Sequence, residues 1–254
     1  MTKSAWSVIG VLIFGTMASS QGPPPTAQDN LDLVLRAWEK AMTDLKSFQV
    51  IVDRTTLDKS FKTEDKFKGY ALFVKAPTKD AGSRARIEMA KTTNSKIYEK
   101  YICTGTYLYE YSPAASVVRV HNMPRGNGAG GQQESFLSFL FGMGADQAKA
   151  RYDMTYVSSD QHYHYVRILP KLAQDKGDFA EARLSLLRSN NLPAQMWYLQ
   201  ANKTEITWSF TASQVDVNIE LKHFDPVVPP GWKMERVQPP VPANVTPTVR
   251  TKPQ

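Results

Sequence analysis

Few residues in this sequence have the type and spacing that catalysis or metal binding requires. His162 and His164 are two positions apart, so both side chains point to the same face if the segment is a strand. Two histidines can begin a metal site, but zinc takes three or four protein ligands, and no third ligand follows at a recognisable spacing. We therefore expect both histidines to be half-exposed strand residues, and we expect no metal site and no cofactor.

An acidic cluster surrounds Gly177 and consists of Asp175, Asp178 and Glu181. Paired carboxylates can hydrolyse glycosidic bonds. Lysines stand beside these acids, which is typical of a solvated turn, and no apolar frame is evident that would shift the pKa values of the acids. We expect no catalysis here. A hydrolase built on these acids, or on the two histidines, is one of three functional hypotheses.

The single cysteine, Cys103, follows Ile102 in a tyrosine-rich segment that reads as a strand. A cysteine in such surroundings behaves as a small buried apolar residue. No histidine is placed by a motif that would make Cys103 a nucleophile. The sequence also lacks the G-x-S-x-G, P-loop and dinucleotide-binding motifs. We therefore expect a protein that is not an enzyme.

The first twenty residues, 1–20, read as a cleaved signal peptide. Lys3 gives the positive start, Ala5–Met17 is a short apolar run, and Ala18-Ser19-Ser20 supplies small residues for cleavage. An uncleaved anchor is the alternative. The cut has no cysteine, so lipid attachment there is excluded. These features predict a periplasmic or secreted protein whose mature chain has no transmembrane segment.

The formal net charge is +7, but the lysines and arginines are scattered. No continuous basic block with interleaved aromatic residues is present, so we expect no nucleic-acid partner. A mild attraction to anionic lipid or to a cell-envelope polymer fits this charge balance, and it would give a peripheral contact with the envelope.

A Pro-rich linker, residues 21–27, precedes one helix, for which the sequence predicts residues 28–45. Apolar residues recur in it at three- and four-residue spacing; they are Leu31, Leu35, Trp38, Met42 and Leu45. About ten short strands follow, separated by turn residues and by no crossover helices, which indicates an antiparallel meander. The expected fold class is α+β. One expected strand runs from Val215 to Leu221, and the Pro-rich tail, 238–254, is expected to be disordered.

The segment Lys100–His121 reads as three strands joined by two tight turns. Tyr107, Tyr109 and Tyr111 share one side of the middle strand, with Leu108 and Glu110 opposite. A sheet with an aromatic face indicates binding rather than catalysis. The tyrosines are candidates for a cavity wall, although the alternation alone also allows them to line the outer face.

A glycine-rich run, 126–131, precedes an apolar segment that contains Phe136, Leu137, Phe139, Leu140, Phe141 and Met143. An apolar helix tethered by glycines can act as a lid over an apolar cavity. The alternative is a plain core helix that lies on the sheet.

Several stretches together resemble a known superfamily. They are Leu35–Glu39, Gly69–Pro77, Tyr101–Pro113, Phe139–Met143, Arg151–Asp153 and His223–Trp232, and they span most of the expected domain, 28–237. In this order they resemble the LolA/LolB-like periplasmic lipoprotein carriers and, more closely, an uncharacterised family of exported planctomycete proteins. The resemblance implies a curved antiparallel sheet, an incomplete β-barrel, with helices covering its concave face. In the carriers that cavity holds lipoprotein acyl chains.

One position departs from the carriers. They place an arginine just before the proline of the strand that matches Gly69–Pro77, where it bonds to the lid helices. This chain has Ala76 there, with Lys75 beside it, and Arg54 or Arg86 could take the role.

The first functional hypothesis is a carrier or binding protein for a lipid, an acyl chain or another apolar ligand. Its candidate cavity and lid residues are Trp38, Tyr107, Tyr109, Tyr111, Phe136, Phe139, Leu140, Phe141 and Met143. The second is a cell-envelope interaction or sensor module that uses the same fold with a filled core. The hydrolase is the third.

Overall fold

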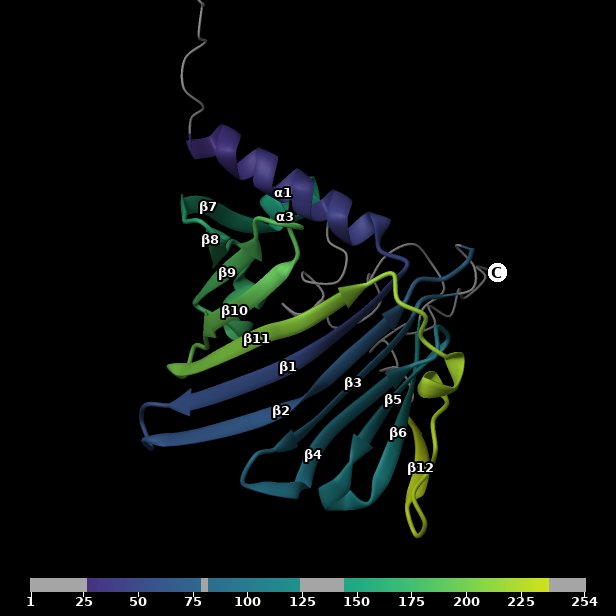
Figure 1. The fold of residues 1–254 in the computed structure, drawn as a ribbon. Coiled ribbons are helices and arrows are strands. Elements are labelled where there is room, and N and C mark those ends of the chain that lie inside the picture. Colours follow the sequence, from purple (N-terminus) through teal and green to yellow (C-terminus); the bar gives the residue numbers. More distant parts are fainter. Residues whose placement is uncertain (1–26, 79–81, 124–143, 238–254) are drawn as a thin grey trace, which may run out of the picture.

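The structure is a computed structural model that describes residues 27–78, 82–123 and 144–237 (Figure 1). The expected signal peptide, the tail, and the apolar residues Phe136, Leu137, Phe139, Leu140, Phe141 and Met143 lie outside the described residues. The described chain contains the helices α1 (Ala27–Asp44), α3 (Ala145–Arg151) and α4 (Ala173–Asp178), and the short 3₁₀ helices η1 (Pro113–Ala115) and η2 (Leu221–Phe224). None of these helices combines the length and the apolar character needed to cross a membrane.

Within the described residues, twelve strands form one sheet. They are β1 (Ser47–Asp58), β2 (Thr63–Val74), β3 (Arg84–Lys91), β4 (Asn94–Cys103), β5 (Tyr107–Ser112), β6 (Val117–Asn122), β7 (Tyr152–Ser159), β8 (Tyr163–Pro170), β9 (Glu181–Leu187), β10 (Pro193–Leu199), β11 (Thr204–Val215) and β12 (Lys233–Val237). Their order is β12-β6-β5-β4-β3-β2-β1-β11-β10-β9-β8-β7, so two meanders join where β1 pairs with β11. The sheet is open, with β12 and β7 as its outer strands, which confirms the expected fold class.

The C-terminal part of the chain differs from the expectation in two ways. Among the described residues the sheet has twelve strands rather than about ten, and β12 lies parallel to β6 whereas the other described pairs are antiparallel. The strand expected at 215–221 is wrong, because β11 ends at Val215 and the chain then leaves the sheet. Asp216 has the left-handed φ of 53°, and its carboxylate accepts a hydrogen bond from the Lys46 amide at 2.8 Å.

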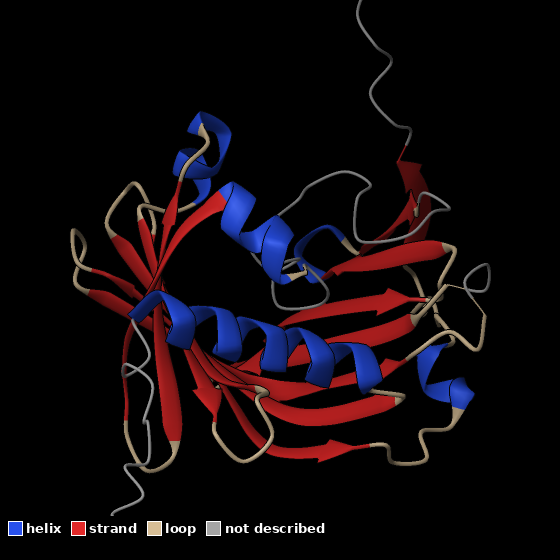
Figure 2. Ribbon diagram, turned by 90° about the horizontal axis from the view of Figure 1, so that it is seen from above, coloured by secondary structure: helices blue, strands red, loops and turns tan. Residues whose placement is uncertain are grey.

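The helix α1 lies across one face of the sheet (Figure 2). A first hydrophobic core lies between them. The expected apolar stripe of the helix is confirmed: Leu31, Leu35, Trp38 and Leu45 are buried and Met42 is half-buried. The core continues through α3 and through side chains of β1 and β7–β11, including Val52, Met196 and Leu186. This half of the sheet is therefore filled beneath α1.

A second core lies on the other face of the sheet. Ala71 of β2 packs against the first core, whereas its neighbours Tyr70 and Leu72 belong to the second. Successive side chains of a strand point to opposite faces, so the two cores occupy opposite faces. The segment 216–232, here called the C-terminal segment, covers this second face and buries Phe224 completely.

Gly69 allows β2 to approach β3 closely. A Cβ atom at this position would lie 1.8 Å from the carbonyl oxygen of Glu88 and 2.6 Å from the Cα atom of Met89. A glycine inside a strand marks such a close backbone approach. Gly69 is therefore required by the geometry of the sheet.

Candidate functional site

The structure separates the predicted site residues into two groups. Trp38 is buried in the first core, under α1. Tyr109 and Tyr111 belong to the second core, on the opposite face, and Tyr107 shares their side of β5 by alternation. The structure therefore does not bring the tyrosines together with Trp38. The remaining predicted site residues, Phe136, Phe139, Leu140, Phe141 and Met143, lie outside the described residues.

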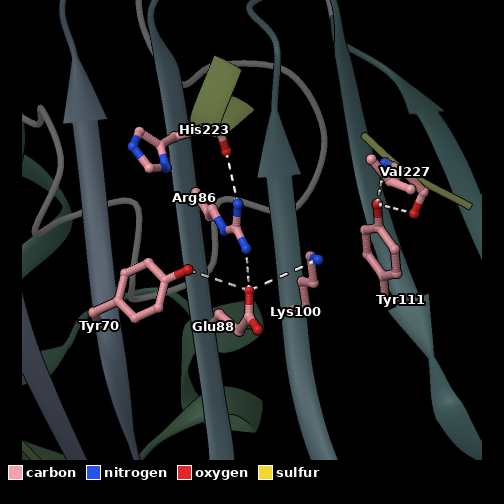
Figure 3. A network of polar contacts seen from close by, with 7 residues as sticks. All are labelled: Tyr70, Arg86, Glu88, Lys100, Tyr111, His223 and Val227. Carbon is pink, nitrogen blue, oxygen red and sulfur yellow. Dashed lines mark hydrogen bonds and ion pairs between the residues drawn. The ribbon is translucent and has the colours of Figure 1, made fainter. Parts of the chain in front are cut away.

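Tyr111 holds the C-terminal segment to the sheet. Its hydroxyl donates to the carbonyl oxygen of Val227 at 3.0 Å and accepts from the amide of the same residue at 3.1 Å (Figure 3). The ring of Trp232 lies 6.4 Å from the Tyr111 ring. Burial raises the pKa of Tyr111, so the hydroxyl stays protonated and able to donate.

A polar network beside Tyr111 has the same role (Figure 3). Arg86 donates to the carbonyl oxygen of His223 at 2.9 Å and to the carboxylate of Glu88. That carboxylate also accepts from the Tyr70 hydroxyl at 3.4 Å and lies 3.7 Å from the Lys100 ammonium group. Burial, and then the Glu88 charge, raise the pKa of Tyr70. The network thus anchors the C-terminal segment to the sheet.

The face of the sheet that holds the first core continues over β4, β5 and β6, where its side chains differ from those of the core. Its central residues are Tyr101, Leu108, Glu110, Arg119 and His121, which we call the inner surface. Their shared side follows from the register, which pairs Tyr101 with Glu110 and Glu110 with Arg119, and places Leu108 opposite His121. Each of these residues is half-buried. Among the described residues on this face of β4–β6, only Val117 is buried.

Glu110 organises the polar part of the inner surface. One of its carboxylate oxygens accepts from Arg119 at 3.2 Å, and the other lies 3.0 Å from Nε2 of His121. Tyr101 lies directly across from Glu110. Burial first, and then the charges of Glu99 and Glu110, raise the pKa of the Tyr101 hydroxyl, which therefore remains a hydrogen-bond donor.

An ion pair on this face of the sheet links β1 to β4. Arg54 of β1 binds Glu99 of β4 through two hydrogen bonds of 2.8 and 2.6 Å. The guanidinium group also lies 4.5 Å from the centre of the Phe67 ring and 5.3 Å from the Trp208 ring. A two-point pair that also stacks on aromatic rings holds its geometry well. Arg54 therefore ties the first core to the inner surface.

Lys75, the residue beside Ala76, contacts the C-terminal end of α1. Its ammonium group donates to the carbonyl oxygen of Thr43, in the last turn of α1. A cation at this end suits the helix dipole. Arg86 cannot take this role, because it faces the C-terminal segment on the other side of the sheet.

Two acids of the predicted acidic cluster, Asp175 and Glu181, form ion pairs with arginines. The expectation of a solvated acidic loop is wrong for Asp175, which is buried and binds Arg151 through two hydrogen bonds of 2.8 and 2.6 Å. Glu181 pairs with Arg167 and Arg183. The hydrogen bond from Arg167, then that from Arg183 and the charges of both arginines, lower the pKa of Glu181. Within the described ranges, no three His, Cys, Asp or Glu side chains are grouped to hold a metal ion.

His164 and Cys103 are each half-buried. Nδ1 of His164 lies 3.4 Å from the Tyr156 hydroxyl, and burial lowers the pKa of His164. His162 is exposed, so the two histidines do not share one environment. Burial raises the pKa of the Cys103 thiol, which points towards the carbonyl oxygen of Ser83 at 3.8 Å. A protonated thiol is a poor nucleophile.

The polar group of Glu110, Arg119 and His121 was not predicted from the sequence. A signal was present, because the Pro-containing turn after Ser112 makes the two flanking segments a hairpin. Pairing across that turn brings Glu110 opposite Arg119. The charged residues on the reverse side of the tyrosine strand were therefore predictable neighbours.

No family model matches the chain, and a search of curated proteins finds no similar sequence. Among solved structures, the chain is similar to an uncharacterised conserved protein from Thermus thermophilus (9% identity, TM-score 0.50), over 82% of this chain and 99% of that one. It is less similar to a complex of MucA and MucB from Pseudomonas aeruginosa (10% identity, TM-score 0.45, 78% of this chain and 61% of that one). A LolA superfamily protein from Nitrosomonas europaea aligns with 13% identity and a TM-score of 0.35, over 80% of this chain and 99% of that one. The similarity to the Thermus protein covers nearly all of that chain, so the two share a fold.

Proposed function

We propose that this protein is a non-enzymatic binding protein for a lipid, an acyl chain or another apolar ligand that carries a polar head. The observation that supports this proposal is the inner surface. Its apolar and aromatic side chains, Leu108 and Tyr101, lie beside the polar group formed by Glu110, Arg119 and His121. An apolar surface with a few convergent polar groups is the usual form of a small-molecule site.

The contrast between the two halves of the sheet supports this location. Under α1 the core is filled, with Leu35, Leu186 and Met196 fully buried. On the inner surface the central side chains are half-buried. Arg119 uses one nitrogen, Nη1, for Glu110 among the described residues, so its guanidinium group retains donors for a head group. In this proposal the ligand lies over β4–β6 rather than beneath α1.

The filled core under α1 favours a second candidate, an envelope interaction module that carries no ligand. In that case the inner surface has no small-molecule occupant. In both readings we place the protein outside the cytoplasm, because residues 1–20 have the features of a signal peptide.

Native mass spectrometry of the protein purified from its own cell envelope tests the proposal. We expect a bound species with the mass of a lipid or fatty acid, which disappears in Leu108→Asp. The matched control is Val157→Asp, which changes an exposed apolar residue on β7. A protein that carries no small molecule, and that binds no added fluorescent fatty acid, supports the second candidate and contradicts the first.

A further inference from the structure

The turn between β1 and β2 presents an aromatic ring to solvent. Phe61 is 80% exposed. The turn is ordered, because one carboxylate oxygen of Asp58 accepts hydrogen bonds from the amides of Ser60 at 2.8 Å and Phe61 at 3.0 Å. Lys62 closes the turn with a left-handed φ of 54°. The ordered backbone of the turn therefore directs the Phe61 side chain towards solvent.

The β1–β2 hairpin extends beyond the adjacent β3–β4 hairpin. The pairing of β2 with β3 stops at Phe67, and the amide of Thr92 donates to the carbonyl oxygen of Lys66 at 2.8 Å. The three residues of β2 that follow towards the turn add about 10 Å at the usual rise of a strand. On the other side the pair Asp58–Thr204 brings the 201–203 turn level with the hairpin (Figure 1).

The turns at this end of the strands are basic. Residues 58–66, 91–97 and 201–205 contain six lysines and four carboxylates. Lys62, Lys96 and Lys203 form no ion pair among the described residues, whereas Lys59 pairs with Glu205. Ile97, which follows Lys96, is 47% exposed. We call residues 58–66, 91–97 and 201–205 the basic edge.

We propose that the basic edge binds the surface of an anionic lipid bilayer, with the Phe61 ring inserted among the head groups. Aromatic rings favour the membrane interface, and each nearby lysine adds attraction to anionic lipid. A single exposed aromatic residue is common in proteins. The combination of a projecting ring on an ordered turn with lysines that form no ion pair among the described residues is what favours a membrane.

A protein partner fits this edge less well. A specific protein interface buries about 800 Å² on each partner, in a continuous patch. The basic edge offers one ring at the end of a hairpin and lysines around it. This arrangement suits a deformable charged surface, and the proposal does not depend on whether the inner surface holds a ligand.

Vesicle flotation tests the proposal with the protein purified from its own cell envelope, and every variant is prepared in the same way. We expect binding to vesicles of equal parts phosphatidylglycerol and phosphatidylcholine, and weak binding to phosphatidylcholine alone. Phe61→Ser should weaken binding about tenfold. Lys62→Gln should weaken it about fivefold, and less in high salt. The controls Val157→Ser and Lys40→Gln remove an exposed apolar residue and an exposed charge elsewhere, and should leave binding unchanged.

A fluorescent label gives a second readout that does not depend on the strength of binding. Phe61→Cys in a Cys103→Ser background is labelled with an environment-sensitive dye, and its emission should shift to shorter wavelength on anionic vesicles. The same dye at Val157→Cys should not shift. Equal binding of wild type and Phe61→Ser, or a dye at position 61 that remains in water while the protein floats with vesicles, overturns the proposal.

Discussion

The hydroxyl of Tyr111 bonds to both the amide and the carbonyl group of Val227. One side chain of β5 thus satisfies the backbone groups of an irregular segment that has no partner strand at this point. The C-terminal segment is held to the sheet largely by such side-chain contacts. Ser47, for example, donates to the carbonyl oxygen of Val217 at 2.5 Å.

Tyr111→Phe should lower the free energy of unfolding by about 1–3 kcal/mol, because two backbone groups of Val227 lose their partner. Amide hydrogen exchange at Val227 should become faster, while β1–β4 keep their protection. The control is Tyr109→Phe, which removes a hydroxyl from the same face that makes no hydrogen bond among the described residues. Urea denaturation measures both variants, and an equal loss in the two would show that the Val227 contact is not important.

Gly69→Ala should destabilise the protein by about 3 kcal/mol or more, because the new methyl group would collide with the carbonyl oxygen of Glu88. Gly177→Ala is the matched control. Nothing lies within 4 Å of a Cβ atom at that position, which is in α4, so its stability should be unchanged or slightly higher. A stable Gly69→Ala protein with an unchanged melting temperature would contradict the close approach of β2 and β3.

Asp175→Asn should cost about 3–5 kcal/mol, since it leaves the buried charge of Arg151 without its carboxylate. Asp178→Asn, on an exposed neighbour, should change stability by less than about 0.5 kcal/mol. Thermal unfolding distinguishes these outcomes. A hydrolase that uses these acids would instead lose activity in both variants, with little change in melting temperature.

Asp160 should make folding sensitive to acid. The hydrogen bond from the Tyr165 hydroxyl, of 2.6 Å, together with those from the amides of His162 and Tyr163, lowers its pKa from 3.8 to about 2. The folded state therefore holds the ionised carboxylate more strongly than the unfolded chain does. This stabilisation is complete above pH 3.8 and disappears as the pH falls through about 2.

The melting temperature of Asp160→Asn should accordingly lie below that of wild type at pH 6, and the difference should shrink towards pH 2. Tyr165→Phe is the matched variant. It removes the first cause of the lowered pKa, and so should show a smaller acid dependence of stability than wild type. A difference between wild type and Asp160→Asn that is equal at pH 6 and pH 2 would show that the carboxylate charge does not stabilise the fold.

Local pattern predicted much of this fold. The spacing of Leu31, Leu35 and Trp38 predicted the helix, and alternation predicted the tyrosine hairpins. Alternation states which residues share a face, but it does not state which face the helix covers. That choice depends on long-range pairing, above all of β1 with β11, for which short segments carry no signal.

The C-terminal segment could not be predicted for a related reason. Apart from the short 3₁₀ helix η2, it is irregular between Asp216 and Trp232. It is held by Arg86, Tyr111 and Ser47, which are distant in sequence. A parallel partner for β6 also needs a long connection, which a meander does not suggest. The three tyrosines give the stronger sequence signal of β5, whereas Leu108 and Glu110 on its reverse side form no motif alone. The Glu110–Arg119 pairing nevertheless follows from the hairpin turn.

In the proposed function, an apolar ligand lies on the inner surface, over β4–β6. Photocrosslinking with a fatty acid that carries a diazirine in its chain, followed by peptide mapping, tests this location most directly. We predict crosslinks at Leu108 and Tyr101, lost when unlabelled fatty acid competes, and none at Tyr109 on the opposite face of the same strand. Crosslinks that lie only on the other face, or that unlabelled fatty acid does not displace, would contradict the claim.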